Sequence, residues 1–233
     1  MFRLFRLTAT VIAVAALAPS AKAETINLLR DTASGVSVSF NYLGSNVTTT
    51  GGIFSWSQTT PLNANFNAAV PTYCIELDQG LTNTTTTFTV QTNLTLAPTI
   101  GTAAKATAIT SLFDRYYNST IGNTSQQAAF QLALWDIIYD GAPSTSVTES
   151  TNGFVKFSNA TAQSMLDAIA NNTAYSNGSL AGNRLVALTN GSLQDQITVD
   201  PNPSNPVPAP PAVLLAGLGA LTLLGRSRFN RAA

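Results

Sequence analysis

The chain has 233 residues, of which 45% are hydrophobic and 9% are charged, against about 25% charged residues in an ordinary soluble domain. The net charge is zero, and residues 24–206 carry all eleven acidic but only five basic residues, so no basic stripe exists for a nucleic acid. Histidine is absent and Cys74 is the only cysteine, which excludes Ser-His-Asp and Cys-His catalysis, zinc–histidine sites and an internal disulfide.

The N-terminus has the pattern of a secretory signal peptide over residues 1–23. Two arginines precede an apolar run, which ends in Ala21-Lys22-Ala23, an A-x-A cleavage site. We therefore expect the mature chain to begin at Glu24, outside the cytoplasm. Because no cysteine follows the apolar run, a lipoprotein anchor is excluded. The alternative interpretation is a buried N-terminal helix.

Residues 24–199 are long enough for one domain, and its first half has the period of β-strands. The segment 35–43 alternates Val36, Val38, Phe40 and Tyr42 on one side, which predicts a half-buried strand. Three further segments are rich in β-branched and aromatic residues and are also expected to be strands: 51–56, 72–77 and 85–94. The Thr/Asn/Gly stretches between them are expected to be loops.

The period then changes to that of helices. Segment 102–118 has apolar residues at helical spacing, and a second helix is expected from a capping box of Thr124 and Gln127 to about Tyr139, ended by Gly141 and Pro143. A weaker helix covers 160–170, and strands return at 184–189 and 195–199. This order predicts an α+β fold: a single β-sandwich or barrel-like domain with two to three inserted helices.

The C-terminus has the composition of a sorting signal. A Pro-rich linker (200–211) leads into the apolar run 212–224, which is followed by Arg226, Arg228 and Arg231. Thirteen helical residues span about 20 Å, short of a hydrocarbon core of about 30 Å, so crossing requires flanking residues or local thinning. Arginines after such a run favour the cytoplasmic side.

Residues 207–231 resemble the PEP-CTERM tail of exosortase substrates in Gram-negative bacteria. The resemblance rests on Val207-Pro208-Ala209-Pro210, the apolar run, and Arg226 with Arg228; Ala209 stands where the family has Glu. It implies transient membrane insertion through the tail, processing by an exosortase-type enzyme, and delivery to the cell surface. The alternative is a permanent tail anchor.

Gln131 lies at the centre of the apolar face of the second predicted helix. On a helical wheel Ala128, Leu134, Trp135 and Ile138 fall beside it. Burying an unpaired amide costs roughly 1–3 kcal/mol, so Gln131 needs a partner. Taken alone, Gln131 is a core amide bonded to the backbone or a polar neighbour, and Cys74 is an inert buried thiol.

Asp136 and Asp140 on the same helix are interpreted as a solvated face, not as an acid pair.

Together, "YCIEL" at 73–77 and "QLALW" at 131–135 resemble the Cys–Gln thioester domain of bacterial surface proteins. Cys74 and Gln131 match the cross-linking pair, and Tyr73, Ala133 and Trp135 match supporting positions, while Phe130 replaces the family threonine. The resemblance implies that the inserted helices carry this core and that Cys74 and Gln131 form a thioester.

A thioester forms when the cysteine sulfur attacks the amide carbonyl and ammonia leaves, which requires close positioning, polarising donors and exclusion of water. Such a bond attaches the protein covalently to amines or polysaccharide hydroxyls on a partner surface, for adhesion or anchoring in a biofilm matrix. No cofactor, metal or enzymatic activity is expected. The alternative is a non-covalent structural envelope or matrix protein.

Overall fold

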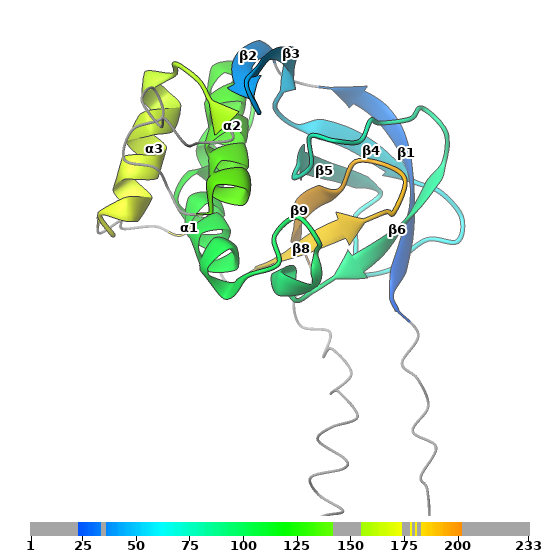
Figure 1. The fold of residues 1–233 in the computed structure, drawn as a ribbon. Helices are drawn as coiled ribbons and strands as arrows, with labels where there is room; N and C mark the ends of the chain where they lie inside the picture. Colours follow the sequence, from blue (N-terminus) through cyan, green and yellow to red (C-terminus); the bar gives the residue numbers. More distant parts are fainter. Residues whose placement is uncertain are drawn as a thin grey trace, which may run out of the picture. The chain divides into compact units, whose positions relative to one another are not determined.

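Six strands form a closed antiparallel barrel in the computed structural model, which describes residues 23–33, 36–141, 155–173, 178, 180 and 183–201 (Figure 1). Around the barrel the order is β1-β4-β5-β9-β8-β6, with β6 pairing back to β1. The strands are β1 (Thr25–Ala33), β4 (Phe54–Gln58), β5 (Ala69–Cys74), β6 (Thr86–Gln91), β8 (Arg184–Thr189) and β9 (Gln196–Asp200). The expected signal peptide up to residue 22 and the expected tail from residue 202 lie outside the described residues.

Alternating side chains fill the barrel. Trp56 of β4 and Phe88 of β6 meet edge to face, with ring centroids 5.6 Å apart, and both are buried. Ile26 and Leu28 of β1 are buried on the same period of two, as expected for strands with one face against a core. The strands predicted at 184–189 and 195–199 are confirmed as β8 and β9.

A second sheet of order β3-β2-β7 consists of β2 (Val36–Tyr42), β3 (Ser45–Gly51) and β7 (Val155–Lys156). Val38 and Phe40 point inward as predicted, but Val36 is 39% exposed and Tyr42 is only half-buried. The Thr/Asn/Gly stretch that forms β3 was expected to be a loop, and that expectation is wrong. Its threonines are β-branched, and β3 pairs with β2 along its whole length.

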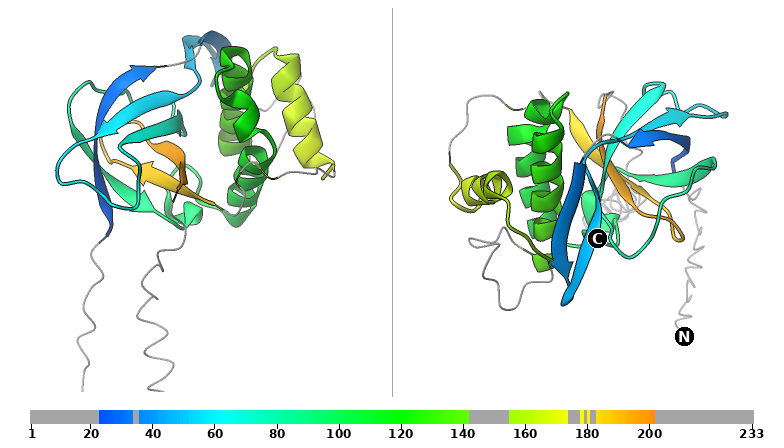
Figure 2. Two further views of the ribbon diagram at one scale, coloured as in Figure 1. Left: turned by 180° about the vertical axis from the view of Figure 1, so that it is seen from behind. Right: turned by 90° about the horizontal axis from the view of Figure 1, so that it is seen from above.

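Three helices lie together on one side of the barrel, with α3 outermost (Figures 1 and 2). They are α1 (Ala103–Thr120), α2 (Thr124–Asp140) and α3 (Ala160–Ala170), and a short 3-10 turn, η1 (Leu94–Leu96), precedes them. All three lie between β6 and β8 in the chain. In α1 the buried face includes Ile109, Leu112 and Phe113, as the helical spacing predicts. The fold is therefore a mixed α+β fold with a six-stranded barrel.

Helix α2 is enclosed on all sides. Every residue from Gln127 to Ile138 is buried, because α2 packs against α1, α3 and the β3-β2-β7 sheet. The expected solvated face is therefore wrong at Asp136, which is 1% exposed. The expected capping box is also wrong: Asn123 is the N-cap, and its side chain accepts from Gln126 N at 3.1 Å. Gly141 ends the helix at φ 85°, as predicted, while Pro143 lies outside the described residues.

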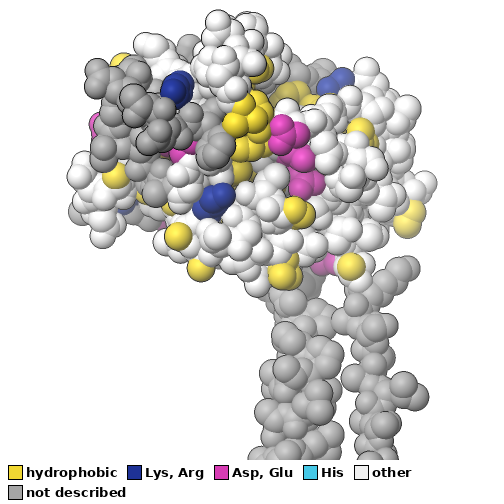
Figure 3. Space-filling model, in the orientation of Figure 1, with side chains coloured by type: hydrophobic (Ala, Val, Ile, Leu, Met, Phe, Trp, Pro, Cys, Tyr) yellow, Lys and Arg dark blue, Asp and Glu magenta, His cyan; other side chains and the backbone are white. Residues whose placement is uncertain are grey.

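Charged side chains are sparse on the face of the molecule drawn in Figure 3, as the composition requires. In the part of the chain that the structure describes, no helix is both long and apolar enough to cross a membrane.

Candidate functional site

The side-chain amide of Gln131 is hydrogen-bonded at both ends to the backbone of Cys74. Its Nε2 donates to Cys74 O at 2.8 Å, and its Oε1 accepts from Cys74 N at 3.2 Å. Gln131 is 0% exposed. The pairing satisfies two backbone groups and the amide at once, which matters because an unpaired buried polar group is costly. Two residues that are 57 positions apart in the chain thus meet in the core.

Cys74 has a free backbone edge because its neighbouring strand begins too late to cover it. In the β4–β5 pair Phe54 lies opposite Thr72, and Phe54 is the first residue of β4. On the other side, β9 pairs Gln196 with Cys74 and Ile197 with Tyr73. The Gln131 amide therefore occupies the place of a strand neighbour at the end of β5 and joins the barrel to α2.

The Cys74 thiol contacts two other glutamines. Sγ donates to Gln194 Oε1 at 3.0 Å, and Gln196 Nε2 donates to Sγ at 3.4 Å. Among the described residues these two side-chain amides, and not that of Gln131, are the hydrogen-bond partners of the thiol. Burial raises the pKa of Cys74 to about 12, opposed by the Gln196 hydrogen bond and by the positive charge of Arg30.

A buried chain of hydrogen bonds along the neighbouring strands β4, β5 and β9 holds Gln196. Trp56 Nε1 donates to Thr72 Oγ1 at 2.9 Å, and Thr72 Oγ1 donates to Gln196 Oε1 at 2.8 Å. Because the carbonyl oxygen of Gln196 is engaged by Thr72, its Nε2 is turned toward Cys74. A donor fixed in this way stabilises a sulfur anion relative to a thiol.

Aromatic rings fix β5 against the helices on the opposite face of the strand. The Tyr73 ring lies 4.6 Å from that of Phe130 on α2 and 6.0 Å from that of Phe113 on α1, measured between centroids. Phe130 is fully buried. The phenyl ring at the position where the thioester family has threonine thus contributes packing between β5 and α2, immediately before Gln131.

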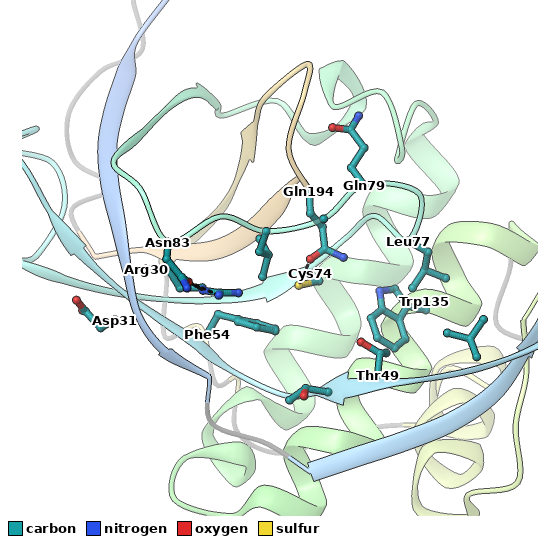
Figure 4. Close-up of a pocket in the computed structure, with 14 residues that line it drawn as sticks. Arg30, Asp31, Thr49, Phe54, Cys74, Leu77, Gln79, Asn83, Trp135 and Gln194 are labelled. Atoms are coloured by element: carbon teal, nitrogen blue, oxygen red, sulfur yellow. Dashed lines mark hydrogen bonds between the residues drawn. The ribbon is translucent and has the colours of Figure 1, made fainter.

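A cavity of about 530 Å³ opens beside the thiol (Figure 4). Cys74, Trp135 and Gln194 line it on one side, and Arg30 with Asn83 on the other. Arg30 Nε donates to Asn83 Oδ1 at 2.9 Å, which holds the guanidinium in place. The sulfur therefore lies at the wall of a cavity large enough for a small ligand.

The residues singled out by the sequence have different positions relative to this cavity. Cys74 and Trp135 line it, Gln131 lies behind Cys74, and Tyr73 and Ala133 are buried in the surrounding core. The expected signal-cleavage residue Ala21 and the expected sorting residues Val207, Pro208, Ala209, Pro210, Arg226 and Arg228 lie outside the described residues.

The partners of the thiol were not predicted from the sequence. Gln194 and Gln196 belong to "LQDQI" at 193–197, where two amides alternate with other residues at strand spacing. That period places two amides on one side of a strand at the barrel, a signal that could have pointed to a buried polar cluster. Nothing local in the sequence indicates Thr72 or Arg30.

The described residues contain no group of three or more His, Cys, Asp or Glu side chains able to hold a metal ion. The chemistry that the site can support is that of a thiol, three glutamine amides and fixed hydrogen-bond donors. Comparison with known proteins finds no family model, curated protein or solved structure that matches this chain.

Proposed function

We propose that the protein is a secreted, exosortase-sorted surface protein of a Gram-negative bacterium whose Cys74 and Gln131 form an internal thioester for covalent attachment to a partner surface. The observation that carries the proposal is the pairing of the buried Gln131 amide with both backbone groups of Cys74. The helices inserted between β6 and β8 supply Gln131, and the barrel supplies Cys74. The reaction is a single internal acyl transfer, not enzymatic turnover.

The backbone N–H of Cys74 is suited to stabilise the reaction's charged intermediate. It donates to Gln131 Oε1 at 3.2 Å, the atom that becomes negative when Sγ attacks Gln131 Cδ. A fixed donor aimed at such an oxygen lowers the barrier to acyl transfer. The C–S bond forms, the C–N bond breaks, and the amide nitrogen leaves as ammonia with the thiol proton.

Two features of the site favour the thiolate against the cost of burial. Gln196 Nε2 donates to Sγ, and Arg30 lowers the pKa of Cys74 by its charge, although burial dominates and raises that pKa to about 12. Attack also requires Sγ to leave its hydrogen bond to Gln194 Oε1. The thioester is thus expected to form slowly and only once, in the folded protein.

The proposed secretion, the proposed processing and the proposed partners depend on sequence features at the two ends of the chain. Residues 1–23 direct secretion, and Val207 to Pro210 with the apolar run and Arg226 and Arg228 direct exosortase-type processing after transient membrane insertion. Amines or hydroxyls of a surface polysaccharide or protein are the chemical class of target. Delivery of this kind places the protein at the cell surface, where it can adhere to a partner surface or anchor in the matrix.

One observation favours a second candidate function. The Gln131 amide and the Cys74 thiol each have hydrogen-bond partners without reacting, since Sγ donates to Gln194 and Gln131 pairs with the backbone. A fully bonded core of this kind is what a non-covalent envelope or matrix protein would also need.

Methylamine distinguishes the two candidates. A thioester adds methylamine at Gln131 and releases one titratable thiol at Cys74, whereas an unreacted amide does not. We expect incorporation in the native chain and none in Cys74→Ala or Gln131→Ala, since each removes one half of the bond. Gln163→Ala is the matched control, because Gln163 bonds to Asp167 on α3 (2.7 Å) and does not line the cavity beside Cys74. Equal labelling of all four proteins would refute the thioester.

A further inference from the structure

The wall of the cavity beside Cys74 contains a buried hydrogen-bond donor. Trp135 lines the cavity and is 1% exposed, and its Nε1 is buried with no acceptor among the described residues. In Figure 4 the indole nitrogen lies on the edge of the ring that faces Cys74 and Gln194. A buried indole N–H left without an acceptor is unfavourable, so a ligand in the cavity that brings an acceptor gains a hydrogen bond there.

The other polar groups of the wall restrict the class of ligand further. Arg30, like the indole, can only donate, and it is positively charged. Thr49 of β3, whose hydroxyl is drawn toward the cavity in Figure 4, can donate or accept. Asp31 also lines the cavity and carries the opposite charge to Arg30, and Gln79 of the wall has a buried Oε1 without a donor among the described residues. A lysine ammonium has three donors and no acceptor, so it can serve Gln79 but not the indole. A hydroxyl group accepts from the indole or guanidinium and still donates to an oxygen of the wall.

We infer that the cavity lined by Trp135, Arg30 and Thr49 binds a saccharide and presents one of its hydroxyl groups to the Cys74–Gln131 thioester as the acyl acceptor. The inference rests on the proposed function and names the class of its target. A saccharide matches the cavity because each hydroxyl is both donor and acceptor, and several are offered at once.

The transfer conserves atoms and charge. Cys74 lines the cavity and Gln131 does not, so the acyl carbon must be drawn to the cavity wall when it is bonded to Sγ. The saccharide oxygen then attacks Gln131 Cδ, a C–O bond forms and the C–S bond breaks. The hydroxyl proton passes to Cys74 Sγ, which becomes a thiol again. Because burial keeps the pKa of that thiol high, the departing sulfur is basic enough to take up the proton. The product is an ester between the protein and the saccharide.

Concentration dependence tests this inference on the full chain, after intact mass has established that one ammonia is missing. The probes are neutral pentasaccharides of glucose, galactose and mannose, together with methylamine and a lysyl peptide. A bound acceptor gives an adduct rate that saturates, whereas an unbound nucleophile gives a rate that rises linearly. We expect saturation for at least one pentasaccharide, linear dependence for both amines, and release of the saccharide adduct by alkaline hydroxylamine, as for an ester.

Variants of the wall separate binding from thioester reactivity. In Thr49→Val the ratio of the saccharide rate to the methylamine rate is expected to fall about three- to tenfold, the loss of one hydrogen bond. Trp135→Phe is expected to lower the same ratio by removing the indole N–H. Thr48→Val is the matched control, because Thr48 bonds to Ser39 across the hairpin (2.9 Å) and does not line the cavity.

The outcomes of these measurements are distinguishable. A missing ammonia with methylamine addition, but with no pentasaccharide adduct or an unchanged ratio in both wall variants, overturns the saccharide inference and leaves the thioester. Saturation by the lysyl peptide alone assigns the cavity to amines and likewise overturns it. A full calculated mass overturns the proposed function itself.

Discussion

The side chain of Gln131 on α2 is hydrogen-bonded to the backbone of Cys74 on β5, and the sequence predicts this contact only in part. Helical periodicity predicted burial of the amide, and its 0% exposure confirms this. The identity of its partner depends on where β4 begins, since only a late start leaves Cys74 uncovered. That is set by strand register between distant segments, which no local pattern determines. Whether the pair is also covalent stays a prediction.

The contribution of the Gln131 amide to stability can be measured in a protein that cannot form the thioester. In a Cys74→Ala background, which cannot form the bond, a further Gln131→Leu change removes both hydrogen bonds to the backbone of residue 74. Leaving a buried N–H and C=O unpaired is expected to lower the free energy of unfolding by about 2–5 kcal/mol. Chemical denaturation measures it, with Gln163→Leu on α3 expected to cost under about 0.5 kcal/mol. A double variant as stable as Cys74→Ala contradicts the pairing.

Asp195 makes stability depend on pH in the acidic range. Burial raises the pKa of its carboxyl to about 6 and the Glu76 charge adds to this, while the Asn190 N–H bond opposes both. The native state therefore holds this proton more tightly than the unfolded chain. The contribution of this bound proton to the free energy of unfolding is complete below about pH 4. It is lost as pH rises through about 6, a change on the order of 2–3 kcal/mol.

Replacing Asp195 isolates its contribution to the pH dependence of stability. Asp195→Asn keeps an oxygen to accept from Asn190 N but cannot titrate, so its free energy of unfolding is expected to vary less between pH 4 and 7 than that of the parent. Urea denaturation across this range is the measurement. Asp167→Asn is the control, because it also replaces one carboxyl by an amide, but on α3, where Asp167 accepts from Gln163 Nε2. Parallel pH profiles for Asp195→Asn and the parent would reject this account.

At the scale of elements, the observed span of α2 is close to the predicted one, but the prediction of its surroundings is wrong. Its apolar run and Gly141 indicated its span, but the expected solvated side is wrong at Asp136, because the β3-β2-β7 sheet and two helices enclose this part of α2. The β3-β2-β7 sheet was not predicted, because a run of polar threonines such as that of β3 is typical of a loop. Polar β-branched residues on an exposed, paired strand have the propensity of a strand and the hydropathy of a loop.

The start of α2 offers a test of the observed cap against the predicted one. Asn123→Ala removes the side chain that accepts from Gln126 N, and it is expected to lower the free energy of unfolding by about 1 kcal/mol. Thr124→Ala changes the first helical residue and is expected to change stability by less than about 0.5 kcal/mol. Thermal unfolding of the two variants compares them directly; a larger loss in Thr124→Ala would restore the capping box.

At the scale of the whole molecule, the sequence predicted an α+β fold with a barrel-like part but not the closure of that barrel. Closure depends on pairs such as Cys74 with Gln196, which are far apart in the chain. The same closure brings "LQDQI" to the thiol, so the missed site residues and the missed topology have one cause. Residues around Cys74 and Gln131 were found because they lie in short recognisable segments.

We propose that the two ends of the chain direct its delivery. Replacing Arg226, Arg228 and Arg231 by Gln removes the basic end of the proposed sorting signal, so surface retention and tail processing are expected to fall. Cell fractionation with mass analysis of the chain measures both. A chain with Lys105 and Lys156 of the body replaced by Gln serves as the control. Unchanged delivery and unchanged chain length in the triple variant would refute the sorting signal.

The most direct test of the central claim is the intact mass of freshly purified protein that has not been exposed to amines. If Cys74 and Gln131 are joined, the mass is lower than that calculated from the processed sequence by one ammonia, and no thiol titrates under denaturing conditions before methylamine is added. Cys74→Ala and Gln131→Ala should each give their full calculated mass. A native chain with its full calculated mass and a titratable Cys74 thiol contradicts the thioester.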